Sequence, residues 1–130
     1  MNTIFEILKM LDWNSAPEIQ QQGRMLAKTG QDLTLFLQPM FPKYNKNTWD
    51  NCAIIFAECD DDRLKPYLIK LLEWLKDLNW PGAFCIFDRI VEFNDTSTLL
   101  EAINICINKA RVLNDEIWEY NMNMIIESRK

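Results

Sequence analysis

The sequence LKPYLIKLLEWLKDL, at residues 64–78, decides the fold class of this chain. Its apolar residues recur at intervals of three and four, the spacing that gathers side chains on one face of an α-helix. This stripe comprises Leu64, Tyr67, Leu68, Leu71, Leu72, Leu75 and Leu78, and the charged residues off it are Lys65, Lys70, Glu73, Lys76 and Asp77. We therefore predict an amphipathic helix whose apolar face packs against other helices.

The same apolar spacing predicts two helices near the N-terminus. The first begins at residues 2–3, and its inward residues are Ile4, Phe5, Leu8 and Leu11. The second runs to about residue 28, and its inward residues are Ile19 and Leu26. Ser15 is the predicted N-cap of this second helix, because Glu18 follows three residues later as in a capping box. Pro17 falls in the first turn, where no amide donor is needed.

The segment at residues 32–46 interrupts the helical pattern. Leu33, Leu35 and Leu37 alternate as in a strand. The neighbours are helical and offer no partner strand, so we predict a short helix that ends before Pro39. Residues 39–46 are predicted to form the longest loop. Asn47 then caps a helix, whose predicted buried stripe comprises Trp49, Cys52, Ala53, Phe56 and Cys59.

Three further helices are predicted after residue 78. Asn79 is the predicted N-cap of a helix over 80–93, with Pro81 in its first turn. This helix is apolar on almost every side, so we expect it to be the most buried. The next helix has the predicted inward residues Leu99, Leu100, Ile103, Cys106, Ile107 and Ala110. Asn114 and Asp115 cap the last helix, whose predicted inward residues are Ile117, Trp118, Met122 and Ile125.

Together these segments predict one all-α domain over residues 1–130, with about eight helices in stacked antiparallel hairpins. Only 3 glycines and 5 prolines interrupt them. Trp49 and Trp80 are 31 residues apart, and Phe56 and Phe87 keep the same offset. Such a period is expected of a HEAT-like α-solenoid, and an irregular helical bundle is the alternative. We expect N-terminal helices in residues 1–43 and HEAT-like hairpins in residues 44–130.

Two motifs resemble those of a known family. They are LLEWLKDLNWPGA at residues 71–83 and NDEIWEY at residues 114–120. Both are similar to signatures of a bacterial domain-of-unknown-function family, number 5071, over about Leu64 to Ile126. The resemblance implies a small helical, HEAT-like protein and brings no established activity. Residues 12–17 fall outside the core pattern of that family, so we expect the N-terminal half to be an added module.

The charge balance bears on the class of partner. The chain carries 14 Lys+Arg against 19 Asp+Glu, a net charge of −5, with no basic run. Binding to nucleic acid is therefore not expected. An acidic surface suits a basic protein partner, although mild acidity also simply maintains solubility. No apolar stretch is long enough to span a membrane, and no secretory leader is evident. We expect a cytoplasmic protein with its four cysteines reduced.

Several kinds of catalytic or metal site lack their residues in this sequence. There is no histidine, no Cys-x-x-Cys spacing and no glycine-rich loop, so we predict no enzymatic activity, no cofactor and no metal. Glu58 and residues 60–62 form an acidic cluster, which we interpret as a solvated turn where Asp61 or Asp62 caps a helix, and not as a cation site. Asp88 and Glu92 are interpreted as an exposed strip.

The candidate site comes from the two family-like motifs. It comprises Glu73, Trp74, Asn79, Trp80 and Trp118. In a functional interpretation, the indole rings line a partner or ligand groove, and Glu73 and Asn79 supply hydrogen bonds. In a structural interpretation, the rings seal a helix–helix corner that Asn79 caps.

Three functional hypotheses follow from these observations. The first is a non-enzymatic protein-interaction domain, in its most concrete form a bacterial immunity-type protein that masks a basic toxin. The second is a small-molecule or peptide binder that uses the Trp-lined groove. The third is an enzyme that uses carboxylates alone, which would require two of them to converge in a cleft.

Overall fold

The computed structural model describes residues 3–30, 32–39 and 46–130, and these residues form an all-α fold. The α-helices are α1 (Ile4–Met10), α2 (Pro17–Thr29), α3 (Trp49–Ala57), α4 (Asp61–Leu64), α5 (Leu68–Trp74), α6 (Ala83–Val91), α7 (Thr96–Val112) and α8 (Glu116–Ser128). Short 3-10 turns occur at Thr34–Phe36, Lys46–Thr48 and Lys65–Tyr67. No strand occurs in the described ranges, and no helix in them is long and apolar enough to cross a membrane.

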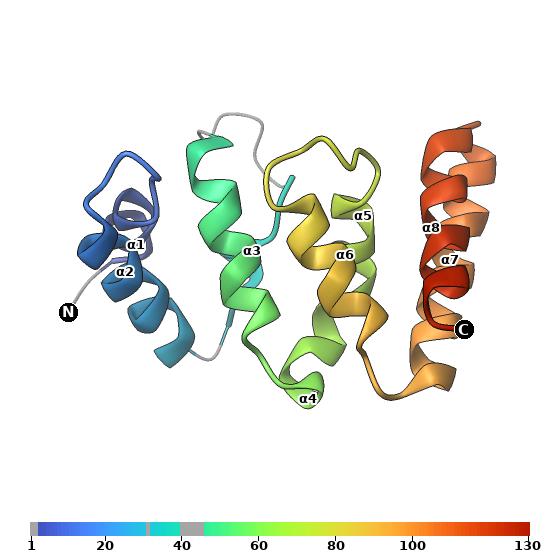
Figure 1. Cartoon of the computed structure of the whole chain (residues 1–130), viewed down its shortest axis with the longest axis horizontal. Coiled ribbons are helices and arrows are strands. Elements are labelled where there is room, and N and C mark those ends of the chain that lie inside the picture. The colour runs from blue at the N-terminus through green and yellow to red at the C-terminus, as the bar shows by residue number, and fades with distance from the viewer. Residues whose placement is uncertain (1–2, 31, 40–45) are drawn as a thin grey trace.

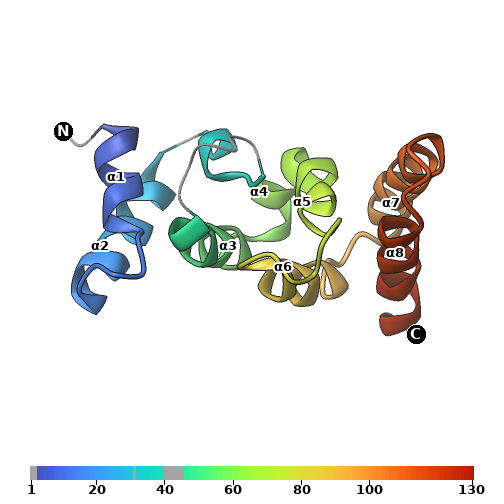
Figure 2. The same cartoon turned by 90° about the horizontal axis from the view of Figure 1, so that it is seen from above.

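The helices stand side by side in a row that runs from α1 to α8 (Figure 1). Seen from above, α3, α6 and α8 form one layer, and α5 and α7 form a second layer behind it (Figure 2). Helices α3 and α6 run in the same direction, while α5 and α7 run against them. Direct contacts join α1 to α2, α2 to α3, α3 to α6, α6 to α8 and α5 to α7. Each helix therefore packs chiefly on its neighbours in the row.

The predicted apolar stripes largely become the core. All five predicted residues of α3 are buried, and so are Leu64, Leu68, Leu71, Leu72 and Leu75 of the segment that decided the fold class. That segment is not one regular helix, however. Pro66 lacks an amide hydrogen and cannot make the α-helical hydrogen bond, so a 3-10 turn at Lys65–Tyr67 separates α4 from α5. Residues 32–37 contain the expected short helical turn, also in the 3-10 form.

The prediction that the helix over 80–93 is the most buried is wrong. Phe84 of α6 is 62% exposed, and the side chains of α6 that are buried are Ala83, Ile86 and Ile90. Helix α3 is the more enclosed of the two, with six buried residues against three in α6. An apolar composition on every side thus does not mean burial on every side.

Of the N-caps predicted at Ser15, Asn47, Asn79 and Asp115, the first three are wrong and the last is confirmed. Ala16 takes the cap position of α2, while the Ser15 hydroxyl donates to the carbonyl of Lys9 (3.2 Å). Helix α3 begins only after the 3-10 turn at Lys46–Thr48, so Asn47 is not its cap. Helix α6 begins at Ala83, four residues after Asn79. The Asp115 carboxylate does cap α8, accepting from the Trp118 amide (3.0 Å).

Four residues predicted to face inward are exposed instead. They are Phe5 (59%), Ile19 (40%), Leu100 (36%) and Ile117 (69%). These residues lie in α1, α2, α7 and α8, the two pairs at the ends of the row (Figure 1). A helix at the end of a row has a packing partner on one side only, which explains the exposure. The predicted loop at residues 39–46 falls mostly on residues 40–45, which lie outside the described residues.

A buried amide fastens the first helix pair to the rest of the row. The Asn51 side chain is 3% exposed. Its Nδ2 donates to the carbonyl of Leu11 (2.7 Å) and to Oε1 of Gln20 (2.9 Å), and its Oδ1 accepts from the Arg24 guanidinium. One side chain of α3 thereby holds the end of α1 and two positions of α2.

We expect Asn51→Ala to lower the free energy of unfolding by about 2 kcal/mol, because the buried carbonyl of Leu11 loses its side-chain donor. Urea denaturation measures the change. The matched control is Asn104→Ala on the exposed side of α7, for which we expect little change. Equal effects of the two substitutions would show that the Asn51 network does not fasten α1 and α2.

Candidate functional site

Three tryptophans meet at the corner between α5 and α6. Trp49 meets Trp74 edge-on, with ring centres 6.1 Å apart, and meets Trp80 edge-on at 5.8 Å. Trp74 is fully buried, and its Nε1 donates to the carbonyl of Pro81 (3.1 Å). Gly82 follows with a φ of 80°, which lets the chain turn against α3. This corner is closed packing that sets where α6 begins.

The structure divides the five predicted site residues between two places. Trp74 and Trp80 belong to the closed corner. Asn79 is exposed beside it, and its amide donates to the carboxylate of Asp77 (2.8 Å) without capping α6. Glu73 and Trp118 line a separate pocket. The three motif tryptophans therefore do not share one groove.

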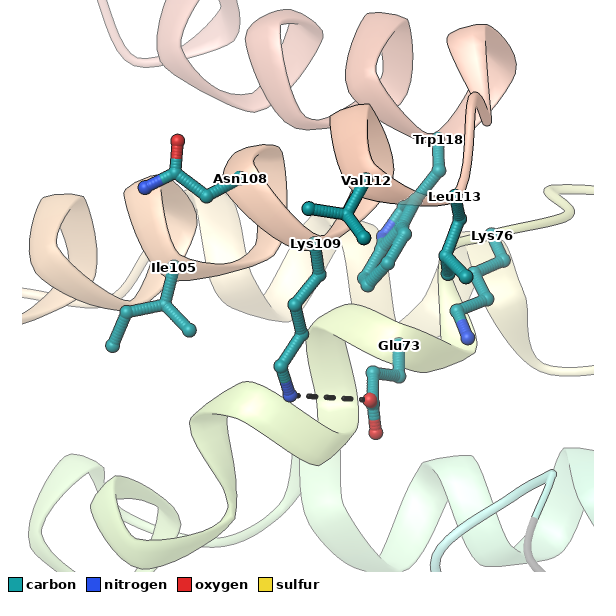
Figure 3. Close-up of a pocket in the computed structure, with 8 residues that line it drawn as sticks. All are labelled: Glu73, Lys76, Ile105, Asn108, Lys109, Val112, Leu113 and Trp118. Atoms are coloured by element: carbon teal, nitrogen blue, oxygen red, sulfur yellow. Dashed lines mark ion pairs between the residues drawn. The ribbon is translucent and has the colours of Figure 1, made fainter.

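The pocket lies between the C-terminal half of α7 and the end of α5, near the start of α8 (Figure 3). We call it the α7 pocket. It is an open pocket with a volume of about 500 Å³, and its lining comprises Glu73, Lys76, Ile105, Asn108, Lys109, Val112, Leu113 and Trp118. Four of these residues, at positions 105, 108, 109 and 112, share one face of α7 because of their helical spacing. Val112 is 83% exposed and Leu113 is 61% exposed, so the apolar lining is open to solvent.

Lysines outnumber carboxylates around the α7 pocket. The Glu73 carboxylate is shared by two ammonium groups, that of Lys70 at 3.2 Å and that of Lys109 at 3.6 Å. Lys76 places its Nζ 4.6 Å from the ring centre of Trp118 and makes no ion pair among the described residues. The Trp118 indole is fully buried, and its Nε1 donates to the carbonyl of Leu72 (3.0 Å).

The sequence interpretation missed most of this pocket. Of the pocket residues, it singled out Glu73 and Trp118 but not Lys76, Lys109, Val112 or Leu113. One signal was present in the sequence. Ile105 and Val112 fall outside the inward stripe predicted for α7, so they are apolar residues expected on the surface and not in the core.

A second surface feature, which we call the acidic face, lies on α3, α4 and α6. It comprises Asp50, Glu58, Asp60, Asp62, Asp88 and Glu92. Asp88 and Glu92 are exposed, as predicted, and follow Phe84 at four-residue steps along α6. Burial raises the pKa of the half-buried Cys85 thiol, and the carboxylates of Asp88, Asp50 and Glu58 raise it further. Carboxylates of α3 and α6 therefore act on the same thiol.

Few cations remain to neutralise the acidic face. Lys28 is held by Glu58 (2.6 Å), and Arg89 is held by Asp61 (2.6 Å). Among the described residues, Asp50, Asp88 and Glu92 make no ion pair. Among the described residues, four exposed carboxylates of the acidic face thus have no basic partner, those of Asp60, Asp62, Asp88 and Glu92.

The turn at residues 60–62 behaves as a helix start. The Asp60 carboxylate caps α4 by accepting from the Arg63 amide (2.9 Å), so the predicted cap at Asp61 or Asp62 is wrong by one residue. Asp61 instead pairs with Arg89 and accepts from the Asn94 amide (2.9 Å). In the part of the chain that the structure describes, no group of three or more potential ligands could hold a metal ion.

A family model for a domain of unknown function, DUF5071, matches residues 42–130. The chain belongs to the DUF5071 family. The match begins further toward the N-terminus than the resemblance at residues 64–126, and it leaves α1 and α2 outside. No curated protein matches the chain, and no solved structure does.

The DUF5071 segment contains both surface features. The α7 pocket and the acidic face lie wholly within residues 42–130. So does Asn51, the residue that holds α1 and α2. Glu58 and Arg63 of the family segment also bind Lys28 of α2. The two helices outside the family match are therefore fastened to the family domain through several of its own side chains.

Proposed function

We propose that this DUF5071 member is a non-enzymatic protein-interaction domain that binds a basic partner through its acidic face. In the most concrete form of the proposal, it is an immunity-type protein that masks a basic toxin in the cytoplasm. The observation that carries the proposal is the set of exposed carboxylates that make no ion pair among the described residues, Asp60, Asp62, Asp88 and Glu92. Phe84, a large apolar side chain that is 62% exposed, lies one turn before Asp88 on α6.

The acidic face would attract a basic partner electrostatically, and Phe84 would supply apolar contact in the bound state. Carboxylates of one sign on adjacent helices raise the association rate of a basic partner and disfavour an acidic one. An exposed aromatic residue among them supplies apolar contact area for the bound state. A row of antiparallel helix pairs, as in HEAT-type solenoids, offers a long face for such contacts.

We expect Asp88→Lys to weaken capture of a basic partner by about ten-fold or more, because it places a cation where the partner presents its own. The chain is immobilised, exposed to lysate of its source organism, and the captured proteins are quantified by mass spectrometry at low and raised salt. We expect the captured partner to be a basic protein, bound in a fixed ratio to the chain, and we expect raised salt to weaken its capture.

Glu101→Lys is the matched control. It makes the same change of charge at an exposed position in the middle of α7, away from the acidic face, and Glu101 makes no ion pair among the described residues. We expect this variant to capture the partner as the unaltered chain does. Equal losses for the two variants would show that capture follows net charge alone, and the absence of any saturable basic partner would count against the proposal.

A specific observation favours a second candidate function, the binding of a small molecule or a peptide. The α7 pocket has the volume of an ordinary ligand site, about 300–1,000 Å³, and Glu73 and Trp118 both line it.

A further inference from the structure

We propose that the α7 pocket binds small organic anions that carry an apolar body, such as a medium-chain carboxylate. This inference does not rest on the acidic face, which lies on other helices. It names the chemistry of the ligand, which neither the family nor any matched protein supplies.

The residues that line the pocket favour a ligand with an apolar body. Ile105, Val112 and Leu113 expose large aliphatic side chains around the pocket, and the buried Trp118 ring lies between Val112 and Leu113 (Figure 3). Ile105, Val112 and Leu113 are accessible to solvent, although α7 buries Cys106, Ile107 and Ala110 in the core. Covering aliphatic surface of this kind stabilises a complex by roughly 25 cal/mol per Å² removed from water.

The charges around the pocket favour a ligand that carries an anionic group. Among the described residues, Lys109 has Glu73 as its one carboxylate partner and shares it with Lys70. Lys76 faces the Trp118 ring and has no carboxylate partner in the described part of the chain. The local charge is therefore positive in a chain whose net charge is −5. An incoming carboxylate would be complementary to these ammonium groups, whereas a cationic ligand would be repelled.

The size of the pocket favours a small ligand over a folded partner. About 500 Å³ lies well within the range of small-molecule sites. The apolar lining is also short, spanning two turns of α7 and the residue that follows the helix. A stable protein interface generally needs a larger continuous surface, on the order of 800 Å² on each partner.

Isothermal titration calorimetry with octanoate and 1-octanol tests the proposal, since the two ligands share a chain length and differ in charge. We expect octanoate to bind about ten-fold more tightly, the gain typical of a charge-assisted contact. The double variant Lys76→Gln/Lys109→Gln should bind the two ligands equally. Glu73 keeps Lys70 as a partner in that variant, so no carboxylate is left unpaired.

A second pair of variants tests the position of the site. Val112→Glu should weaken octanoate by at least about ten-fold, because it puts an anion beside the ligand and removes aliphatic contact. Tyr120→Glu makes the same charge change at an exposed residue of α8 outside the lining and should have no effect. Thermal melts followed by circular dichroism verify that each variant is folded.

Three results would overturn the proposal. The first is equal binding of octanoate and 1-octanol by the unaltered chain, and the second is octanoate binding that Val112→Glu leaves unchanged. The third is no saturable octanoate binding together with a dimer in sedimentation experiments that Val112→Glu dissociates. That last result would assign the apolar lining to a second copy of this chain.

Discussion

Replacing Gly82 with alanine is expected to lower the free energy of unfolding by about 3 kcal/mol, the larger part of it from crowding in the Trp corner. A Cβ atom at this position would lie 2.7 Å from Cβ of Ala53 and 2.9 Å from the carbonyl oxygen of Trp49. Both atoms belong to the buried helix α3, which cannot give way as a flexible side-chain end would. The φ of 80° adds a cost of about 1 kcal/mol for any residue with a side chain.

Gly30→Ala is the matched control for this prediction. Gly30 has a φ of −74°, and the nearest atom to an added Cβ is the carbonyl oxygen of Ala27 at 3.5 Å. We expect no loss of stability and a gain of up to about 1 kcal/mol, because alanine restricts the unfolded chain more than glycine does. Urea denaturation measures both variants. A Gly82→Ala protein as stable as the unaltered chain would mean that α3 and the corner move apart at little cost.

Trp118→Ala is expected to lower the free energy of unfolding by about 4 kcal/mol, the usual cost of removing a fully buried indole. The ring is 0% exposed between α5 and α8, and its Nε1 hydrogen bond to Leu72 joins the two helices. The substitution also removes the surface on which Lys76 rests. Thermal and urea unfolding, followed by circular dichroism, measure the loss.

Two further variants divide the loss of stability into its causes. One removes the indole hydrogen bond of Trp118 and keeps the ring, and the other removes a tryptophan that is not buried. Trp118→Phe keeps most of the ring volume but loses the indole donor, and we expect a cost of about 2 kcal/mol. Trp13→Ala removes a tryptophan that is 47% exposed and should change stability by less than about 1 kcal/mol. If Trp118→Ala cost no more than Trp13→Ala, the burial of Trp118 would not contribute to stability as described.

Apolar periodicity predicted the core of the middle helices well, because a buried helix face recurs at a fixed spacing. The stripe that begins at Trp49 is buried throughout. Periodicity failed at Phe5 and Ile117, since it reports an apolar residue and not whether a neighbouring helix is present to cover it. Both residues lie in the helix pairs that end the row.

Local residue types predicted the helix starts poorly where tertiary packing competes. Asn79 and Pro81 together form a good start signal, yet the packing of Trp74 and Trp80 on Trp49 delays α6 until Ala83. Asp115 caps α8 as predicted, in a turn where no such packing intervenes.

The two surface features depend on pairs of residues that are distant in the sequence. Glu73 and Lys109 meet because α5 packs against α7, and Asp50 acts on Cys85 because α3 lies beside α6. Helical periodicity within one segment contains no information about such neighbours. The exposed strip at Asp88 and Glu92 was predictable, whereas its continuation onto α3 was not.

The row of helices also determines how the chain would respond to a mechanical load. The α1–α2 pair and the α7–α8 pair lie at opposite ends of the row (Figure 1). Tension applied through the two ends of the polypeptide therefore acts along the stacking direction and peels one pair at a time from its neighbour. The bonds of Asn51 with Leu11 and Gln20 are among the contacts that such a load would strain at one end.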